Sequence, residues 1–332
     1  MARAESAITG KAILVTGAGG FIGSHLVERL VALGARPRAL VRYTSRGDAG
    51  WLTGSPAAKH VQIVRADITD RMAVGRAVDG CEIVIHLAAL IGIPYSYEAP
   101  ASYVRTNVEG TLALLEAARV AGVSRFVHTS TSEVYGSARY APIDEGHPLQ
   151  AQSPYSATKI AADKLVESFH YAFGLPAVII RPFNTYGPRQ SARAVVPTII
   201  TQTLRDGSVE LGNVSPTRDL TYVADTVDGF VRACTADRVE GEVIHLGTGV
   251  EESIGDLAAR IGRVLGRTID VRVTGERTRP RGSEVDRLCA DTTRARDLLG
   301  WSPAHTLDQG LRLTVDWIRE HLHEYRTSGY AV

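Results

Sequence analysis

Tyr155 and Lys159 are the residues whose types and spacing indicate chemistry most directly. They stand four residues apart in the segment Ser-Pro-Tyr-Ser-Ala-Thr-Lys, so on a helix they lie on one face, one turn from each other. A phenol titrates at about 10 and is a poor base at neutral pH, whereas a nearby ammonium favours the phenolate and lowers the pKa. The pair predicts a general base for the hydroxyl of a sugar or another alcohol, although this spacing also arises by chance on helices.

A second group of polar side chains follows the apolar segment 125–128, which predicts a strand. Thr131, Ser132 and Glu133 come just after it. In an open α/β sheet, the carboxyl ends of the strands are where catalytic side chains gather. We therefore expect these three residues to share a site with the tyrosine and the lysine.

A glycine-rich turn near the start of the chain predicts a dinucleotide site. Residues 11–15 predict a strand, Gly17, Gly20 and Gly23 follow it, and residues 24–33 have helical periodicity. Glycine at these positions permits a tight turn, a close approach of the backbone to a pyrophosphate, and close packing of the helix on the strand. The N–H groups at the start of the helix would bind the phosphates.

The end of the second predicted strand, residues 37–42, bears on the choice of cofactor. An NAD-binding protein usually has an acidic residue there, which accepts a hydrogen bond from the ribose 2′-hydroxyl. In this chain Arg42, Ser45 and Arg46 occupy the region, and the first carboxylate is Asp48. These residues suit a 2′-phosphate and favour NADP over NAD. The alternative is that Arg42 is a solvated loop residue.

Other polar or small residues follow later predicted strands. Asp67 would meet the adenine or cap the next helix. Ala88 and Ala89 are small enough to let a cofactor pass close to the backbone. Asn107 lies in an otherwise apolar helix, where we expect either hydrogen bonding near the site or a purely structural role.

Strands and helices alternate along most of the chain, which is typical of an α/β fold. Further strands are predicted at residues 61–66, 82–87, 177–180, 208–211, 220–222 and 243–246. Helices are predicted from about residue 70 and at residues 102–121, 154–173, 196–204, 223–234, 254–265, 293–299 and 307–321. The pattern predicts a Rossmann-type doubly wound parallel sheet with a smaller C-terminal α/β substrate domain. We expect the first domain to comprise 1–185 and about 223–250, and the second 186–222 and 251–332.

Composition excludes several classes of protein. The 332-residue chain has a net charge of +1, so we expect neither nucleic acid nor a membrane surface as a partner. The three cysteines, Cys81, Cys234 and Cys289, are far apart and have no metal-ligand spacing. We expect no metal, no signal peptide, no membrane span and a reducing, cytoplasmic location.

Taken together, these motifs resemble those of extended short-chain dehydrogenases/reductases that modify nucleotide sugars. The resemblance covers nearly the whole chain. Besides the glycine turn and the Tyr155/Lys159 pair, it rests on His86-Leu-Ala-Ala89, Thr129-Ser-Thr-Ser-Glu-Val-Tyr-Gly136, Arg181-Pro-Phe-Asn184, Arg218-Asp-x-x-Tyr222-Val-x-Asp225 and Leu246-Gly-Thr-Gly249.

Within that family, the triplet Thr131-Ser132-Glu133 resembles GDP-mannose 4,6-dehydratases. The dTDP-glucose 4,6-dehydratases carry Thr-Asp-Glu, simple 4-epimerases usually lack the carboxylate, and UDP-glucuronate decarboxylases can also carry Thr-Ser-Glu. The longer segment from Tyr135 to Pro197 is similar to dehydratases of legionaminic-acid-type pathways, which act on nucleotide-linked N-acetylglucosamine.

The resemblance implies an NAD(P)-dependent nucleotide-sugar 4,6-dehydratase with a tightly bound, recycled NADP or NAD. The product would be a 4-keto-6-deoxy sugar nucleotide, made from a UDP- or GDP-linked N-acetylhexosamine or hexose. The helices at 102–121 and 154–173 would form a homodimer through a four-helix bundle.

The resemblance also assigns roles to individual residues. The expected catalytic residues are Thr131, Ser132, Glu133, Tyr155 and Lys159. The expected cofactor-binding residues are Gly17, Gly20, Phe21, Ile22, Gly23, Arg42, Ser45, Asp67, Ile68, Leu87, Ala88, Ala89, Asn107, Thr129, Tyr155 and Lys159. The expected substrate-binding residues are Asn184, Arg189, Val196, Arg218, Arg281 and Glu284.

Other functions stay open on the same scaffold. They are 4-epimerisation, 5,6-dehydration and decarboxylation of a uronic acid, and Ser132 leaves the general acid of a dehydration unidentified. A non-catalytic dinucleotide-sensing protein is a further alternative. Such proteins typically lose the tyrosine–lysine pair, which is present here.

Overall fold

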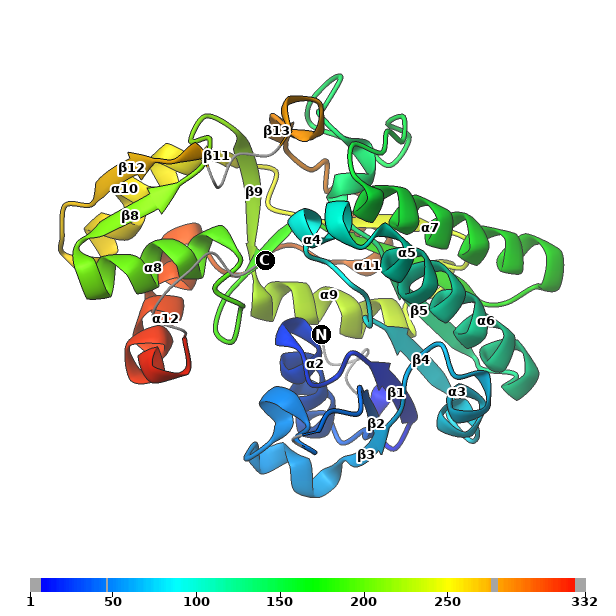
Figure 1. Ribbon diagram of the computed structural model, residues 1–332. Helices are drawn as coiled ribbons and strands as arrows, with labels where there is room; N and C mark the ends of the chain where they lie inside the picture. Colours follow the sequence, from blue (N-terminus) through cyan, green and yellow to red (C-terminus); the bar gives the residue numbers. More distant parts are fainter. Residues whose placement is uncertain (1–6, 46, 276–279, 326–332) are drawn as a thin grey trace.

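The computed structural model describes residues 7–45, 47–275 and 280–325 (Figure 1). Its centre is a parallel sheet of seven strands in the order β10-β6-β5-β4-β1-β2-β3. The strands are β1 (Ala12–Thr16), β2 (Arg36–Val41), β3 (Gln62–Arg65), β4 (Ile83–His86), β5 (Arg125–Thr129), β6 (Ala177–Pro182) and β10 (Val243–Leu246). The strand order reverses between β1 and β4, which is where open α/β sheets bind their ligands. The predicted Rossmann-type sheet is confirmed.

Helices cover both faces of this sheet because alternate strand residues point to opposite sides. Ile13 and Val15 belong to one hydrophobic cluster, and Leu14 belongs to the other. The first cluster includes residues of α2 (Phe21–Ala32), α9 (Val223–Thr235) and α11 (Thr293–Leu299). The second includes residues of α3 (Arg71–Val78), α6 (Gly110–Ala121) and α7 (Pro154–Phe173).

A smaller lobe lies beside the sheet, at the left of Figure 1. Its helices are α8 (Val195–Asp206), α10 (Ile254–Leu265) and α12 (Leu307–Glu320), which share a separate hydrophobic cluster. Its strands are β7 (Asn184–Tyr186), β8 (Ser208–Leu211), β9 (Thr217–Tyr222), β11 (Glu251–Ser253), β12 (Asp270–Val273) and β13 (Arg287–Leu288). β9 pairs with β7, β11 and β13, and β8 pairs with β12.

One segment of the predicted second domain packs into the nucleotide-binding lobe. Ala295, Leu299 and Trp301 lie in the core of the nucleotide-binding lobe, although the second domain was expected to include them. The indole N–H of Trp301 donates to the backbone oxygen of Asp225 at 2.9 Å, which fixes α11 against α9. The chain therefore returns to the first lobe at α11, and the alternation of strands and helices in the sequence did not predict this return.

The long helix predicted at 102–121 is interrupted. It consists of α5 (Pro100–Tyr103), a π-helical segment η3 (Val104–Glu109) and α6, and the short helix α4 (Ile93–Glu98) precedes it. A π-helical segment adds residues to a turn, is rare, and often occurs at functional sites. Hydrophobic periodicity does not distinguish it from a regular helix, which is why the sequence predicted one continuous element.

Short helical turns complete the described chain: η1 (Gly50–Leu52), η2 (Pro56–His60), η4 (Ser132–Tyr135), η6 (Arg281–Ser283) and η7 (Leu322–Glu324). No helix in the described ranges is long and apolar enough to cross a membrane.

Candidate active site

Helix α7 positions Tyr155 and Lys159 at the carboxyl end of β5. Ser153 is the N-cap of α7, its hydroxyl accepts a hydrogen bond from the backbone N–H of Ser156 at 3.1 Å, and Pro154 occupies the first turn. These features fix where the helix starts, and thereby which residues share its buried face. Tyr155 is 7% exposed and Lys159 is 4% exposed.

Lys159 is bound to the last residue of β5. Its Nζ donates to the backbone oxygen of Thr129 at 2.7 Å. Burial lowers the pKa of Lys159 to about 8, and the charge of Asp163 acts in the opposite direction. The hydroxyl oxygen of Thr129 is buried and has no hydrogen-bond partner among the described residues, so it is available to a ligand.

The side chain of Tyr155 interacts with that of Thr131, the N-cap residue of η4. The Thr131 hydroxyl also accepts from the backbone N–H of Glu133 at 3.2 Å. Burial raises the pKa of Tyr155, the hydrogen bond with Thr131 lowers it, and the charge of Glu133 raises it. Burial outweighs the hydrogen-bond contribution from Thr131, so the predicted lowering of this pKa by Lys159 is not found, and the role of Tyr155 as a base stays a prediction.

Ser132 and Glu133 differ in exposure although they are neighbours. Ser132 is 3% exposed and lies in the protein interior. Glu133 is only partly buried. The structure thus brings Thr131, Glu133 and Tyr155 together beside Lys159. Their catalytic roles stay predictions.

The glycine turn between β1 and α2 fits a dinucleotide phosphate. A Cβ on Gly17 would lie 2.9 Å from the backbone nitrogen of Ala88, and a Cβ on Gly23 would lie 2.3 Å from the oxygen of Gly17. Gly20 begins α2 without a side-chain cap. The first-turn N–H groups therefore lack a side-chain partner at the edge where a phosphate would bind.

The sequence did not identify Thr16, which shapes the same edge from the end of β1. Its hydroxyl oxygen accepts from the backbone N–H groups of Leu87 and Ala88, each at 3.1 Å, and lies 2.8 Å from Nδ1 of His86. It fixes the segment after β4 close to the glycine turn. Leu87, Ala88 and Ala89 are all partly buried there, and Phe21 and Ile22 form the first turn of α2.

The adenosine end of the predicted cofactor site carries both signs of charge. The carboxylate of Asp67 accepts from the N–H and hydroxyl of Thr69 at 2.9 and 2.7 Å. The backbone bond from Thr69 lowers the pKa of Asp67, and the charge of Arg42 adds a smaller lowering. Arg42 and Ser45 are exposed, and Ile68 is buried. A carboxylate and an arginine thus lie at this end of the predicted site, whereas the predicted preference for NADP relied on the arginine alone.

Asn107 lies in η3 and joins two segments of the site. Its Oδ1 accepts from the N–H of Leu90 at 2.8 Å, and its Nδ2 donates to the oxygen of Leu90 and the hydroxyl of Thr158, both at 3.0 Å. These partners hold the segment after β4 against α7. Asn107 therefore has the structural role that the sequence left open, and cofactor contact stays a prediction.

Two predicted substrate residues follow β6 but have different surroundings. Asn184 has a buried Oδ1 without a hydrogen-bond partner among the described residues. Arg189 instead donates to Ser24 at 3.1 Å and to Glu28 at 2.9 Å, both on α2, and its φ is +70°. Arg189 links the loop after β7 to the nucleotide-binding lobe, so a role in substrate binding would require it to share these partners.

The remaining predicted substrate residues belong to the smaller lobe. Arg218 on β9 is 6% exposed and lies 3.9 Å from the carboxylate of Glu284, so these two are brought together. Val196 is 1% exposed in the core of the lobe. The side chain of Arg281 lies outside the described part of the structure.

Two acidic residues of the motif that contains Arg218 have structural partners. Asp219 is fully buried and accepts from the N–H groups of Thr248, Gly249 and Ala290 at 2.7, 2.9 and 3.1 Å. Asp225 accepts from the backbone of Ala304 and from His305. The motif therefore positions β9 and the loops beside it.

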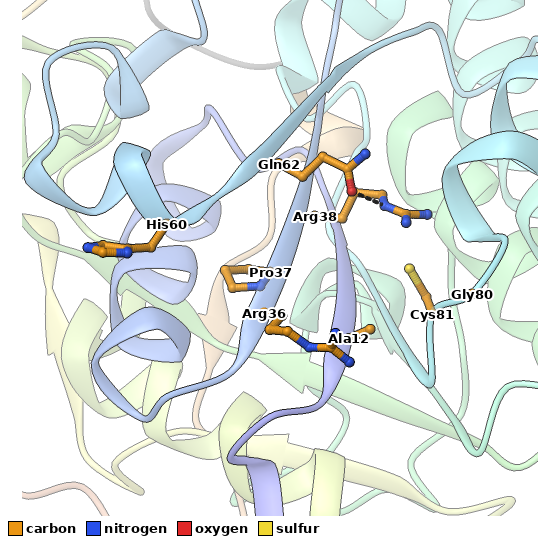
Figure 2. A pocket seen from close by; sticks show the side chains of 8 residues that line it. All are labelled: Ala12, Arg36, Pro37, Arg38, His60, Gln62, Gly80 and Cys81. Carbon is orange, nitrogen blue, oxygen red and sulfur yellow. Dashed lines mark hydrogen bonds between the residues drawn. The ribbon is translucent and has the colours of Figure 1, made fainter.

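Figure 2 shows a pocket at the opposite edge of the sheet. Its lining includes Arg36, Arg38, Gln62 and Cys81, close to the amino ends of β2, β3 and β4. Arg38 already donates to Gln62 at 2.8 Å and to the oxygens of Ala77 and Asp79 at 2.7 Å each. This pocket is separate from the site at the carboxyl ends. Within the described ranges, no group of three or more His, Cys, Asp or Glu residues could hold a metal ion.

Comparison with known proteins gives the family. Residues 14–314 match the family described as GDP-mannose 4,6 dehydratase. The chain is 38% identical over 312 residues to a UDP-glucose 4-epimerase of Mycolicibacterium smegmatis, covering 92% of this chain and 98% of the relative. It is 36% identical over 317 residues to a dTDP-glucose 4,6-dehydratase of Streptomyces antibioticus, covering 93% and 92%.

A solved structure indicates the same family as these relatives. The dTDP-glucose 4,6-dehydratase of Streptomyces venezuelae, determined with NAD bound, superposes with a TM-score of 0.86 at 31% identity and covers 95% of this chain and 98% of that chain. The chain therefore belongs to the nucleotide-sugar 4,6-dehydratase/epimerase family of extended short-chain dehydrogenases/reductases.

Proposed function

We propose that this enzyme is a 4,6-dehydratase that converts a UDP- or GDP-linked N-acetylhexosamine or hexose into the 4-keto-6-deoxy sugar. The observation that carries this proposal is the partly buried carboxylate of Glu133, two residues from the hydroxyl that binds Tyr155. Oxidation at C4 needs only the tyrosine, whereas loss of water needs a second base for the C5 proton.

Each protein group then has a defined task. Tyr155 takes the proton of the sugar 4-hydroxyl, and Thr131 binds the 4-oxygen. The ketone acidifies C5, where Glu133 removes the proton and passes one to the departing C6 hydroxyl, which leaves as water. The glycine turn after β1 would hold a nicotinamide dinucleotide, which would supply the transfer of hydride from C4 to C6. Glu133 or solvent supplies the C5 proton of the product.

The cofactor would be a nicotinamide dinucleotide with Arg42 at its 2′ group and Asp67 at the adenine edge, where the charge of Arg42 reaches it. Arg42 favours a 2′-phosphate, and the nearby Asp67 carboxylate disfavours one by like-charge repulsion. Release of the cofactor by denaturation, followed by mass spectrometry, tells NADP from NAD. An Arg42→Ala variant should lose more affinity for NADP than for NAD.

A homodimer through α6 and α7 accompanies this function. Val120 on α6 is 90% exposed and Tyr171 on α7 is 79% exposed, so both helices present apolar side chains outward. Light scattering at several concentrations tests the proposal, and a monomer throughout would reject it.

A 4-epimerase is the second candidate. Two observations favour it: the identity to a UDP-glucose 4-epimerase, and the serine at position 132, which leaves Glu133 as the one acidic residue of the triplet. Epimerisation requires oxidation at C4 and return of hydride to the other face of C4, with no role for Glu133.

Product analysis separates the two candidates. The enzyme is incubated with UDP-N-acetylglucosamine, GDP-mannose, dTDP-glucose and UDP-glucuronate in turn, and products are analysed by mass spectrometry. Loss of one water supports the dehydratase and identifies the nucleotide. An unchanged mass with a new stereoisomer identifies an epimerase, and loss of carbon dioxide a decarboxylase.

A further inference from the structure

A buried ion pair lies on the far side of Lys159 from Tyr155. Asp163 is fully buried, and its Oδ2 accepts from Nη2 of Arg181 at 2.8 Å and from the hydroxyl of Ser130 at 2.7 Å. Arg181 is 2% exposed and also donates to the hydroxyl of Tyr135 at 2.6 Å. Asp163 was not among the site residues predicted from the sequence.

The position of Asp163 on α7 relates it to the catalytic pair. Tyr155, Lys159 and Asp163 follow one another at intervals of four residues, so they form one stripe along the helix. The end of β5 binds two of them through consecutive residues. Thr129 accepts from Lys159 through its backbone oxygen, and Ser130 donates to Asp163 through its hydroxyl. The ammonium and the carboxylate are therefore fixed on the same short segment.

The two histidines beside Lys159 do not supply a negative charge there. On β5, Nε2 of His128 lies 3.4 Å from Oδ1 of Asp163, and on β4 the ring of His86 lies 5.4 Å from that of His128. Burial lowers the pKa of His128 to about 4 and also lowers the pKa of His86, so both are neutral at pH 7.

Arg181 on β6 is a cation, and the charge of Glu133 acts on Tyr155 on the substrate side. Burial of an ammonium is unfavourable unless an anion accompanies it. Asp163 is the described residue whose charge raises the pKa of Lys159 against burial. Burial acts to raise the pKa of Asp163 itself, but the contact with His128 and the charge of Arg181 hold that pKa at about 2.

We propose that Asp163, anchored by Arg181 and Ser130, is a positioning residue that keeps Lys159 an ammonium on the carbonyl of Thr129. Asp163 acts through Lys159 and does not touch the substrate. The inference rests on the proposed function only in that Tyr155 works as the base, which dehydration and epimerisation share.

The composition of the chain allows a direct test, because it contains only four lysines: Lys11, Lys59, Lys159 and Lys164. Enzyme labelled with 13C at the lysine ε-carbons gives four signals, and the signal missing from Lys159→Arg is that of Lys159. Titration of this signal in wild type and in Asp163→Asn should show its pKa at least about one unit lower in the variant.

Two further variants keep the test decisive. Ser130→Ala removes a hydrogen bond from the same carboxylate oxygen but leaves its charge, so the Lys159 titration should move less than in Asp163→Asn. If Asp163→Asn does not fold because Arg181 is left unpaired, Asp163→Asn with Arg181→Met removes both charges. An unchanged Lys159 titration in the folded single or double variant, or equal shifts in Ser130→Ala and Asp163→Asn, would overturn the proposal.

Kinetics add a functional measurement. In Asp163→Asn the alkaline limb of the kcat profile should move to lower pH by the shift in Lys159, with KM little changed. A uniform loss at every pH would instead indicate a structural role and contradict the proposal. The titration by NMR needs no turnover, so it stands or fails independently of whether the enzyme is a dehydratase.

Discussion

The two sides of Lys159 differ in how deeply their charged groups are buried. On the inner side, one oxygen of Asp163 accepts from Ser130 and Arg181, and the carboxylate is fully buried. On the outer side, Glu133 is partly exposed, and the hydroxyl of Thr129 has no partner among the described residues. We infer that the inner side holds fixed charge, whereas the outer side is where protons can be transferred to and from a substrate.

Removing the phenol tests the outer side most strongly. Tyr155→Phe should lower kcat by about 10³-fold, within the range for loss of a general acid–base group. Tyr103→Phe is the matched control, because its ring lies edge-on to Tyr155 with centroids 6.3 Å apart and its hydroxyl donates to Gly92 instead. Equal losses of kcat in the two variants, measured from initial rates, would contradict the role of Tyr155 as the general base.

Glu133→Gln should lower dehydration by about 10²-fold while oxidation at C4 continues, so a reduced cofactor accumulates and is seen by its absorbance. The amide keeps the shape of the side chain but cannot take the C5 proton. Glu116→Gln on the surface of α6 should leave the rate unchanged. Full dehydration by Glu133→Gln would show that the outer carboxylate is not the base.

Acid should act on the inner side through buried histidines. Burial lowers the pKa of His128 to about 4 and of His245 to about 3, below the ordinary 6.5. Between pH 6.5 and 4 the unfolded chain binds protons that the folded chain does not bind. The free energy of unfolding therefore falls as the pH falls. His128 alone contributes a loss of about 3 kcal/mol by pH 4.

Urea unfolding at pH 7 and at pH 4.5 measures this loss. A variant with Gln at position 128 should show a weaker pH dependence than the wild type. A midpoint that is independent of pH across this interval would mean that these histidines are protonated in the folded protein.

A smaller effect is expected at Asn107, which connects α7 to the segment after β4. Asn107→Ala removes hydrogen bonds with Leu90 and Thr158 inside the protein and should cost about 1–3 kcal/mol of stability. Asn213→Ala is the control, since that side chain is exposed and its Oδ1 accepts one local bond at 3.0 Å. Thermal unfolding that ranks the control as the more destabilised variant would contradict the role given to Asn107.

The sequence predicted the outer side better than the inner side. The regular alternation of strands and helices predicted the sheet. Tyr155, Lys159 and Glu133 follow patterns that depend on local spacing. Asp163 follows the same spacing, but its role depends on Arg181, which is eighteen residues away along the chain and comes from another element.

The smaller lobe was harder to predict for a related reason. Strands as short as β11 and β13 have too few residues to show a hydrophobic period, and they form only because β9 pairs with them. The bonds from Arg189 to Ser24 and Glu28 join parts of the chain more than 160 residues apart, so nothing local indicates them.

In the proposed dehydration, the hydride leaves C4 and returns to C6 while Glu133 removes the C5 proton. The most direct measurement uses a nucleotide sugar deuterated at C4 and NMR of the product. Deuterium at C6, with loss of one water and with the C5 proton exchanged in heavy water, is the predicted result. Deuterium retained at C4 in a product of unchanged mass would contradict the account and identify the enzyme as an epimerase.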